Sequence, residues 1–127
     1  MSSNNPTVSV IVTTKNEETV IGRLLLSIER QTYKNIEILV VDNFSTDATL
    51  EIANKYNTQI YNFGPERSAQ RNYGAKKSKG EFLFFLDADM ELTSRVVSDC
   101  VEAAKKDGLG GVVIPEESRA VNFWGRV

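Results

Sequence analysis

The sequence of 127 residues contains no histidine and a single cysteine, Cys100. Without histidine, a general base has to be a carboxylate or a less usual group. A bound metal ion has to take oxygen ligands, because one thiol cannot build a thiolate cluster. A lone cysteine also cannot form an internal disulfide, which fits a reducing compartment. These absences leave carboxylates as the main candidates for catalysis or metal binding.

An excess of positive charge and long apolar runs are also lacking. The formal net charge is -2, whereas domains that neutralise phosphate backbones are usually strongly basic. We therefore expect no nucleic-acid partner. No apolar run approaches the roughly 20 residues of a membrane span, and the opening MSSNNPTVS lacks the basic and apolar regions of a signal peptide. The sequence predicts a cytoplasmic location, with membrane association left open for a longer parent protein.

The composition that remains is that of one globular domain spanning residues 1–127, with 41% hydrophobic and 25% charged residues. Short apolar runs bounded by turn-prone residues alternate with segments of helical period. Apolar residues recur with one-sided helical spacing at 20–28 and again at 96–104. The expected strands cover residues 8–13, 36–42, 59–63, 81–87 and 111–115.

This alternation predicts an α/β fold. Strands that are apolar on both faces belong in a mostly parallel sheet with helices on both faces, which gives a Rossmann-like, three-layer α/β/α arrangement. Ligands of such sheets bind beyond the carboxyl ends of the strands, and polar segments follow four of the strands here. Asp and Asn are also ordinary turn residues. Four polar edges together favour a binding site formed by Asp42, Arg71, Asp87 and Asp89.

The segment EFLFFLDADMEL, residues 81–92, ends an apolar strand with two carboxylates, Asp87 and Asp89. Positions i and i+2 of an extended strand lie on one side, so these charges repel unless a cation lies beside them. Mg2+ or Mn2+ accepts one or two carboxylates and completes its shell with phosphate oxygens and water. The motif therefore predicts a divalent metal site, for Mn2+ or Mg2+, that a diphosphate completes.

A second chemistry fits the same local pattern. In phosphatases of the haloacid-dehalogenase type an apolar strand also ends in Asp-x-Asp, and the first Asp, here Asp87, attacks phosphorus. That motif usually follows the first strand and carries Thr or Val two residues after the second Asp. In this chain it follows the fourth expected strand, and the corresponding residue is Glu91. The three residues alone do not separate the two chemistries.

The order of four motifs is more specific. The segments VSVIVTTKNEE, IEILVVDNFSTDAT and ERSAQRNYGAKKSKGEFLFFLDADMEL resemble the nucleotide-sugar-binding part of family 2 glycosyltransferases of the GT-A fold. The resemblance covers nearly the whole chain and implies a role for six residues. It places Thr13 and Glu17 around the nucleoside, Asp42 on the base, Arg71 near the nucleotide, Asp87 near the ribose or metal, and Asp89 on the metal ion that bridges the diphosphate.

The resemblance implies a glycosyltransferase that moves a sugar from a nucleotide donor to an unknown acceptor with inversion at the anomeric carbon, and with Mn2+ or Mg2+ as cofactor. A carboxylate such as Asp42 suits a base edge that offers an N–H, as in uracil or guanine. The expected donor is therefore a UDP- or GDP-sugar. A metal bound to the leaving diphosphate would stabilise the charge that develops as the sugar–phosphate bond breaks.

The chain departs from the family in two places. The second family motif commonly reads Asp-Asp-Gly-Ser, whereas this chain has Asp42, Asn43, Phe44 and Ser45. The family's catalytic base is an acidic residue of a later, acceptor-binding half, so we expect the base beyond Val127 and the present domain to be truncated. Glu116 and Glu117 fit a solvated turn better than a base.

The tail VNFWGRV leaves two aromatic side chains, Phe123 and Trp124, with little of their own domain to contact. We expect either a longer protein or self-association through this tail. Two further classes stay open. A nucleotidyltransferase would need a glycine- and arginine-rich loop after the first strand, which TTKNEETVIGR does not supply. A non-catalytic nucleotide-binding or interaction module is compatible with the sequence.

Overall fold

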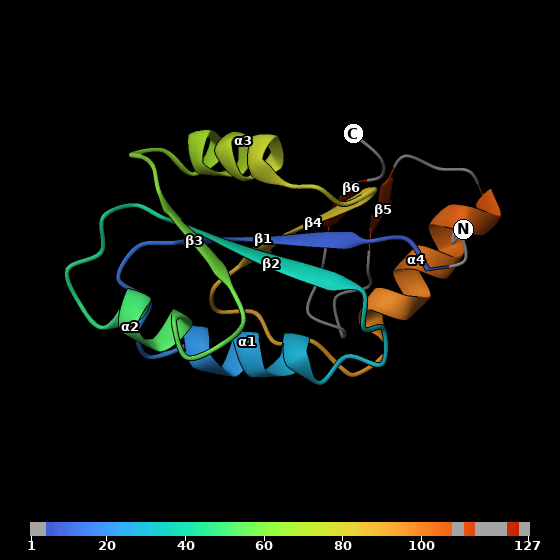
Figure 1. The fold of residues 1–127 in the computed structure, drawn as a ribbon, viewed down its shortest axis with the longest axis horizontal. Coiled ribbons are helices and arrows are strands. Elements are labelled where there is room, and N and C mark those ends of the chain that lie inside the picture. The colour runs from blue at the N-terminus through green and yellow to red at the C-terminus, as the bar shows by residue number, and fades with distance from the viewer. Residues whose placement is uncertain (1–4, 108–110, 114–121, 125–127) are drawn as a thin grey trace.

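The computed structural model describes residues 5–107, 111–113 and 122–124. The chain forms one sheet with helices on both faces (Figure 1). The strands are β1 (Val8–Thr14), β2 (Ile36–Asp42), β3 (Gln59–Asn62), β4 (Phe82–Asp87), β5 (Gly111–Val113) and β6 (Asn122–Trp124). The helices are α1 (Ile21–Glu29), α2 (Thr49–Ala53), α3 (Arg67–Lys77) and α4 (Val96–Asp107). The α/β fold predicted from the sequence is confirmed.

Four strands form the parallel part of the sheet, in the order β3-β2-β1-β4. β1 lies between β2 and β4, and all seven of its residues are buried. This burial explains its continuous apolar sequence, since a central parallel strand is covered on both faces. The register pairs Thr13 with Asp87 and Thr14 with Asp42, so the carboxyl ends of three strands lie at one level.

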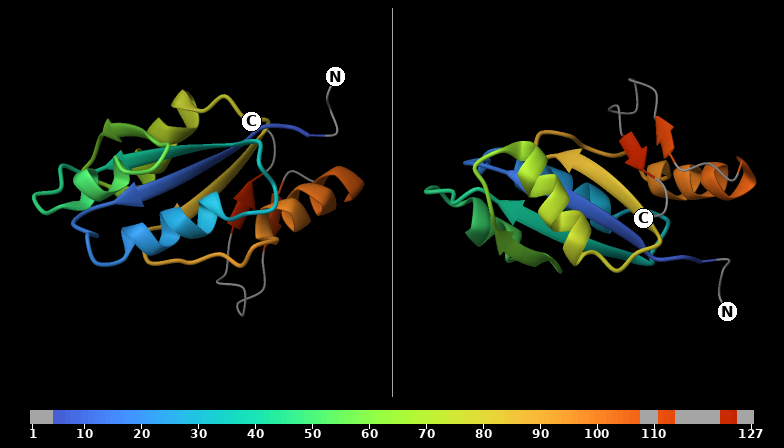
Figure 2. Two further views of the ribbon diagram at one scale, coloured as in Figure 1. Left: turned by 60° about the horizontal axis from the view of Figure 1, so that its bottom comes forward. Right: turned by 90° about the horizontal axis from the view of Figure 1, so that it is seen from above.

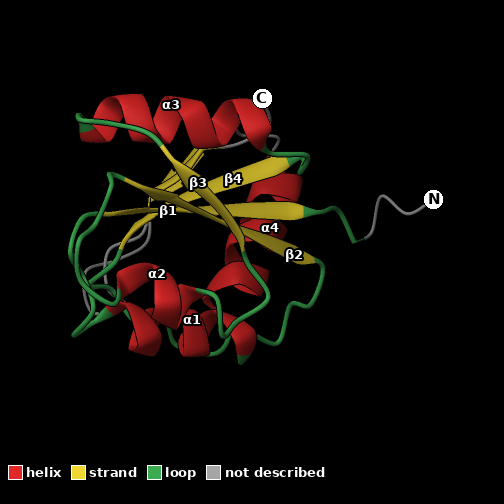
Figure 3. Ribbon diagram, turned by 60° about the vertical axis from the view of Figure 1, so that its left-hand side comes forward, coloured by secondary structure: helices red, strands yellow, loops and turns green. Residues whose placement is uncertain are grey.

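The helices divide unequally between the two faces. Figure 3 shows α3 alone on one face, with α1, α2 and α4 on the other. The larger core lies under those three helices, and a smaller one under α3 is built on Ile11, Leu39, Val41 and Leu83. The predicted stripe on α1 is confirmed, because Ile21, Leu24, Leu25 and Ile28 are all buried. No helix in the described part of the chain is long and apolar enough to cross a membrane.

The sheet differs from expectation beyond β4. The predicted fifth strand is present as β5, which covers three residues, but β5 does not pair with β4. The unpredicted β6 lies between them and is antiparallel to both. Figure 2 shows β5 and β6 as two short red strands near α4. β5 therefore runs in the direction of β4 without being its neighbour. Residues 114–117, with Glu116 and Glu117, lie outside the described residues.

The tail residues Phe123 and Trp124 were expected to have little of their own domain to contact. Their backbone instead pairs with Phe84 and Leu83 of β4. The expectation was wrong for the backbone of the tail, because the side of β4 that faces away from β1 pairs with this segment. A three-residue strand is too short to be recognised from sequence pattern.

Candidate functional site

The loops after β1 and β2 are tied together at the carboxyl edge of the sheet. The amide of Asn16 donates to Ser45 Oγ at 2.7 Å, and Asn16 Oδ1 accepts from the amide of Thr46 at 2.8 Å. The amide of Glu17 donates to Thr49 Oγ1 at 2.7 Å. These side chain–backbone bonds satisfy loop amides that would otherwise need water. The two loops therefore form one ordered wall of the predicted site.

Asp42 is the anchor of this wall. It is fully buried, and its carboxylate accepts from Thr14 Oγ1 at 2.5 Å and from the hydroxyl and amide of Ser45, each at 2.7 Å. Three hydrogen bonds leave one acceptor position of the carboxylate, on Oδ2. The predicted contact of Asp42 with a nucleobase would have to use that position. In this structure Asp42 fixes the turn that starts at the end of β2.

The departures at Asn43 and Phe44 have structural consequences. Asn43 Nδ2 donates to the main-chain oxygen of Pro65 at 2.9 Å, so the residue that replaces a family carboxylate ties this loop to the segment before α3. Phe44 has φ of 50° and an exposed side chain. That left-handed backbone explains why the position suits glycine, which adopts it without steric cost.

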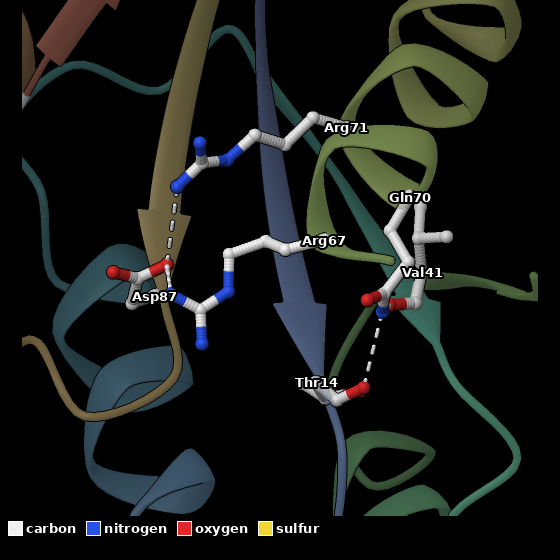
Figure 4. A network of polar contacts seen from close by, with 6 residues as sticks. All are labelled: Thr14, Val41, Arg67, Gln70, Arg71 and Asp87. Atoms are coloured by element: carbon white, nitrogen blue, oxygen red, sulfur yellow. Dashed lines mark hydrogen bonds and ion pairs between the residues drawn. The ribbon is translucent and has the colours of Figure 1, made fainter. Parts of the chain in front are cut away.

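Asp87, at the end of β4, faces two arginines of α3 (Figure 4). Arg67 Nη1 lies 3.8 Å and Arg71 Nη2 3.6 Å from Asp87 Oδ1. Arg71 was predicted from the sequence, and Arg67 was not. The signal was available, because Arg67 stands four residues before Arg71 in ERSAQRN and residues at i and i+4 share one helix face.

Two further residues fix the position of α3. Gln70 is buried and its side-chain amide donates to the main-chain oxygens of Thr14 at 3.1 Å and Val41 at 2.8 Å. Gly74 lies so close to the sheet that a Cβ there would meet Ile11 Cγ2 at 2.6 Å. Gln70 and Gly74 follow Arg67 at helical spacing on the same face. The contacts that hold α3 against the sheet therefore also aim its arginines at Asp87.

Two buried oxygen atoms at this edge lack hydrogen bonds from the described residues, Thr13 Oγ1 and Asp87 Oδ1. They belong to residues that are paired across β1 and β4. Buried polar atoms are nearly always hydrogen-bonded, and an exception calls for a ligand, an ion or a water molecule. Both were predicted site residues, and their geometry is that of a site built to receive a polar group.

Glu17 and Asp89 lie in the same electrostatic environment. The pKa of Glu17 is raised, first by burial and then by the negative charge of Asp89, while Arg67 acts in the opposite direction. Asp87 and Asp47 raise it further. Asp89 itself is exposed in the turn that follows β4. Glu17, Arg67, Asp87 and Asp89 therefore interact across one site, although they come from three different segments of the chain.

The predicted site residues fall on two sides of the sheet edge. Thr13 and Thr14 are successive residues of β1, so their side chains point to opposite faces. Asp87 pairs with Thr13 and faces α3, whereas Asp42 pairs with Thr14 on the face of α1 and α2. The structure thus brings Arg71 and Asp87 together as predicted and keeps the carboxylate of Asp42 apart from them.

The arrangement is compatible with a divalent ion held partly by a ligand. Within the described residues, no three Asp, Glu, Cys or His side chains are close enough to enclose a metal. Mg2+-type sites commonly use one or two protein carboxylates and complete their shell with phosphate oxygens and water. Asp89 is exposed, and Asp87, two residues earlier, has a carboxylate oxygen that accepts no hydrogen bond from the described residues. These two carboxylates fit that donor set.

Solved structures with this fold bind nucleotide sugars. The crystal structure of TarS residues 1–349 from Staphylococcus aureus in complex with UDP-GlcNAc superposes with a TM-score of 0.70 at 34% identity, over 84% of this chain and 33% of that one. A mannosyltransferase from Pyrobaculum calidifontis in complex with GDP-Man and Mn2+ superposes with a TM-score of 0.79 at 22% identity, over 96% of this chain and 45% of that one. The fold is therefore the GT-A fold.

Sequence comparison gives the family. Residues 9–125 match the model of glycosyl transferase family 2, and the chain belongs to that family. A relative from Campylobacter jejuni, the GalNAc(5)-diNAcBac-PP-undecaprenol beta-1,3-glucosyltransferase, is 32% identical over 111 residues, which are 80% of this chain and 35% of that protein. The chain thus spans about a third of the length of this relative. Family membership favours a glycosyltransferase over the phosphatase and nucleotidyltransferase alternatives.

Proposed function

We propose that this chain is the donor-binding part of a glycosyltransferase and binds a UDP- or GDP-sugar at the carboxyl edge of its sheet. The observation that carries the proposal is the buried Asp87 Oδ1, which makes no hydrogen bond to the described residues and lies between Arg67 and Arg71. A diphosphate with a divalent cation supplies the negative and positive charges that such a mixed site lacks. The TarS complex with UDP-GlcNAc, at 34% identity, supports a uridine donor.

The residues divide the work of donor binding. Thr13 and Glu17 line the nucleoside end, and Asp42 holds the Ser45 turn that borders it. Because Asp42 is fully buried, a contact of its Oδ2 with a base N–H requires that turn to shift. Arg71 lies near the nucleotide phosphates. Asp89, with Asp87, would hold Mn2+ or Mg2+, which when bound stabilises the charge of the leaving diphosphate.

The transfer step would be a single displacement with inversion at the anomeric carbon. The acceptor hydroxyl loses its proton to a carboxylate, its oxygen bonds to the anomeric carbon, and the bond to the diphosphate oxygen breaks. We assign this base to none of the described residues. We expect it in a segment beyond Val127, because the chain spans only about a third of the length of the proteins that it matches. The acceptor is left open.

Nucleotide titration tests the proposal. In the presence of Mn2+, UDP or GDP should raise the thermal midpoint of the chain, and Asp89→Ala should abolish most of the rise. The rise should be smaller when EDTA replaces Mn2+. If neither nucleotide moves the midpoint, or if Asp89→Ala responds as the parent does, the donor site is not here.

A non-catalytic nucleotide-binding module would give the same titration result, because both functions use the same donor site. Turnover separates them. A glycosyltransferase releases UDP or GDP from a nucleotide sugar, at least slowly to water, when the chain is present within its longer protein. Binding of the nucleotide sugar without any release of UDP or GDP over hours would favour the non-catalytic alternative.

A further inference from the structure

Arg67 and Arg71 converge on one oxygen of Asp87 from successive turns of α3 (Figure 4). Two guanidinium groups thus face one carboxylate, while Glu17 and Asp89 add negative charge nearby. The nitrogen–oxygen distances are 3.8 Å for Arg67 and 3.6 Å for Arg71. A charge-assisted hydrogen bond between such groups has a donor–acceptor distance of about 2.7–2.9 Å. The two arginines therefore offset the charge of Asp87 without donating a hydrogen bond to its Oδ1.

The exposure of the three side chains shows which of them can move. The side chain of Arg67 is 60% exposed and that of Arg71 43%, against 31% for Asp87. Ion pairs that are this exposed are weak, because water competes for both charges. Asp87 lies at the end of a buried strand, whereas the arginine heads lie at the ends of long flexible side chains. The arginines can leave Asp87 at little cost.

The charge of Arg67 also reaches the nucleoside side of the site. It acts on Glu17 in the loop after β1, in the direction opposite to that of Asp89. Arg67 thus interacts electrostatically with Glu17 of the loop after β1 as well as with Asp87 at the end of β4. A guanidinium group in that position has geometry for binding phosphate oxygens in pairs.

We infer that Arg67, together with Arg71, exchanges partners in this site: it covers Asp87 when the site is empty and binds the donor diphosphate when a divalent cation takes Asp87. This inference rests on the proposed function and adds a residue that the family motifs do not assign. The exchange couples the two ligands, since the cation alone has to displace the arginines while the cation with a diphosphate gives them a new partner. Binding of either ligand then strengthens binding of the other.

The coupling predicts effects of opposite sign in one variant. Arg67→Gln should bind Mn2+ alone about threefold more tightly than the parent, because a weak competing ion pair is lost. The same variant should bind UDP in saturating Mn2+ about tenfold more weakly, because a charge-assisted hydrogen bond is lost. Arg95→Gln is the matched control, since Arg95 pairs with Asp99 on the exposed surface of α4 and has the same charge. It should change neither affinity.

The experiment is calorimetry of Mn2+ alone, and of UDP and GDP in saturating Mn2+, on the parent, Arg67→Gln and Arg95→Gln, with circular dichroism confirming the fold of each. Opposite shifts in Arg67→Gln, absent from Arg95→Gln, support the exchange. Unchanged affinities in Arg67→Gln, or weakening of both ligands together, overturn it while the donor site stands. If the parent binds neither nucleotide, the proposed function fails and the exchange fails with it.

Discussion

Gln70 on α3 donates its side-chain amide to the main-chain oxygen of Thr14 at the end of β1, at 3.1 Å. A second hydrogen bond from the same nitrogen reaches the main-chain oxygen of Val41 on β2 at 2.8 Å. The carboxyl ends of two parallel strands are thus joined by one buried side chain. The helix that carries it also carries both arginines of the site, so fold and site depend on the same contact.

Gln70→Leu removes both donated hydrogen bonds, while the main-chain oxygen of Thr14 keeps the one that it accepts from the amide of Asn43. A hydrogen bond contributes about 0.5–1.5 kcal/mol net, so we expect the loss of two at this buried position to lower the free energy of unfolding by about 2 kcal/mol. Urea unfolding followed by circular dichroism measures this. Gln59→Leu also removes two hydrogen bonds, one to Glu37 and one from Tyr61, but at a partly buried position where water can replace them, so it should cost about 1 kcal/mol. Equal losses in the two variants would show that Gln70 is not a special anchor.

Gly74→Ala should force α3 away from the sheet, because the new Cβ would lie 2.6 Å from Ile11 Cγ2. Overpacking of this kind costs about 1–3 kcal/mol. Gly22→Ala on α1 is the control, since its Cβ would meet Ile52 at an ordinary 3.5 Å. That variant should gain up to about 1 kcal/mol from helix propensity. A Gly74→Ala protein as stable as the parent would contradict the close approach of α3.

The sequence allowed the parallel part of the sheet to be predicted almost to the residue. The reason is that β1, β2 and β4 are buried on both faces, and burial of that kind leaves a continuous apolar run. The carboxyl-edge residues Arg71 and Asp87 followed from strand ends and from the family motifs. Continuous apolar runs of this kind identify the strands, but they do not show which strands pair with each other.

The rest depended on tertiary contacts that no local pattern encodes. β6 is three residues long, and its place between β4 and β5 comes from antiparallel pairing with both. Asp42 was expected beside Asp87, but the alternation of β1 directs the two carboxylates to opposite faces. Arg67 escaped notice because it belongs to the site only once α3 is placed by Gln70 and Gly74.

Glu17 should make the stability of the chain depend on pH. Its pKa in the folded protein is raised above the ordinary 4.5 by burial and by Asp89, so folding favours the protonated form. The stability that this preference contributes is present below about pH 4.5 and is lost as pH rises through the higher folded pKa. Glu17→Gln should therefore be more stable than the parent at pH 7, and the difference should vanish on acidification.

Thermal unfolding of the parent and Glu17→Gln between pH 4 and pH 7, in EDTA, measures this difference. Glu51→Gln on α2 is a control, because it removes the charge of a glutamate that lies on an exposed helix position. A parent that is more stable than Glu17→Gln at pH 7 would mean that Glu17 is stabilised as a carboxylate, contrary to the crowding of negative charge at this site.

The central claim is that Asp87 and Asp89 hold a divalent ion against the diphosphate of a bound nucleotide. Its most direct test is anomalous diffraction from crystals of the chain grown with UDP, or with GDP, and Mn2+. We predict a manganese peak at the carboxyl edge of the sheet, in direct coordination with a carboxylate oxygen of Asp89 and beside the nucleotide phosphates. A nucleotide bound elsewhere, or bound at this edge with manganese away from both aspartates, would contradict it.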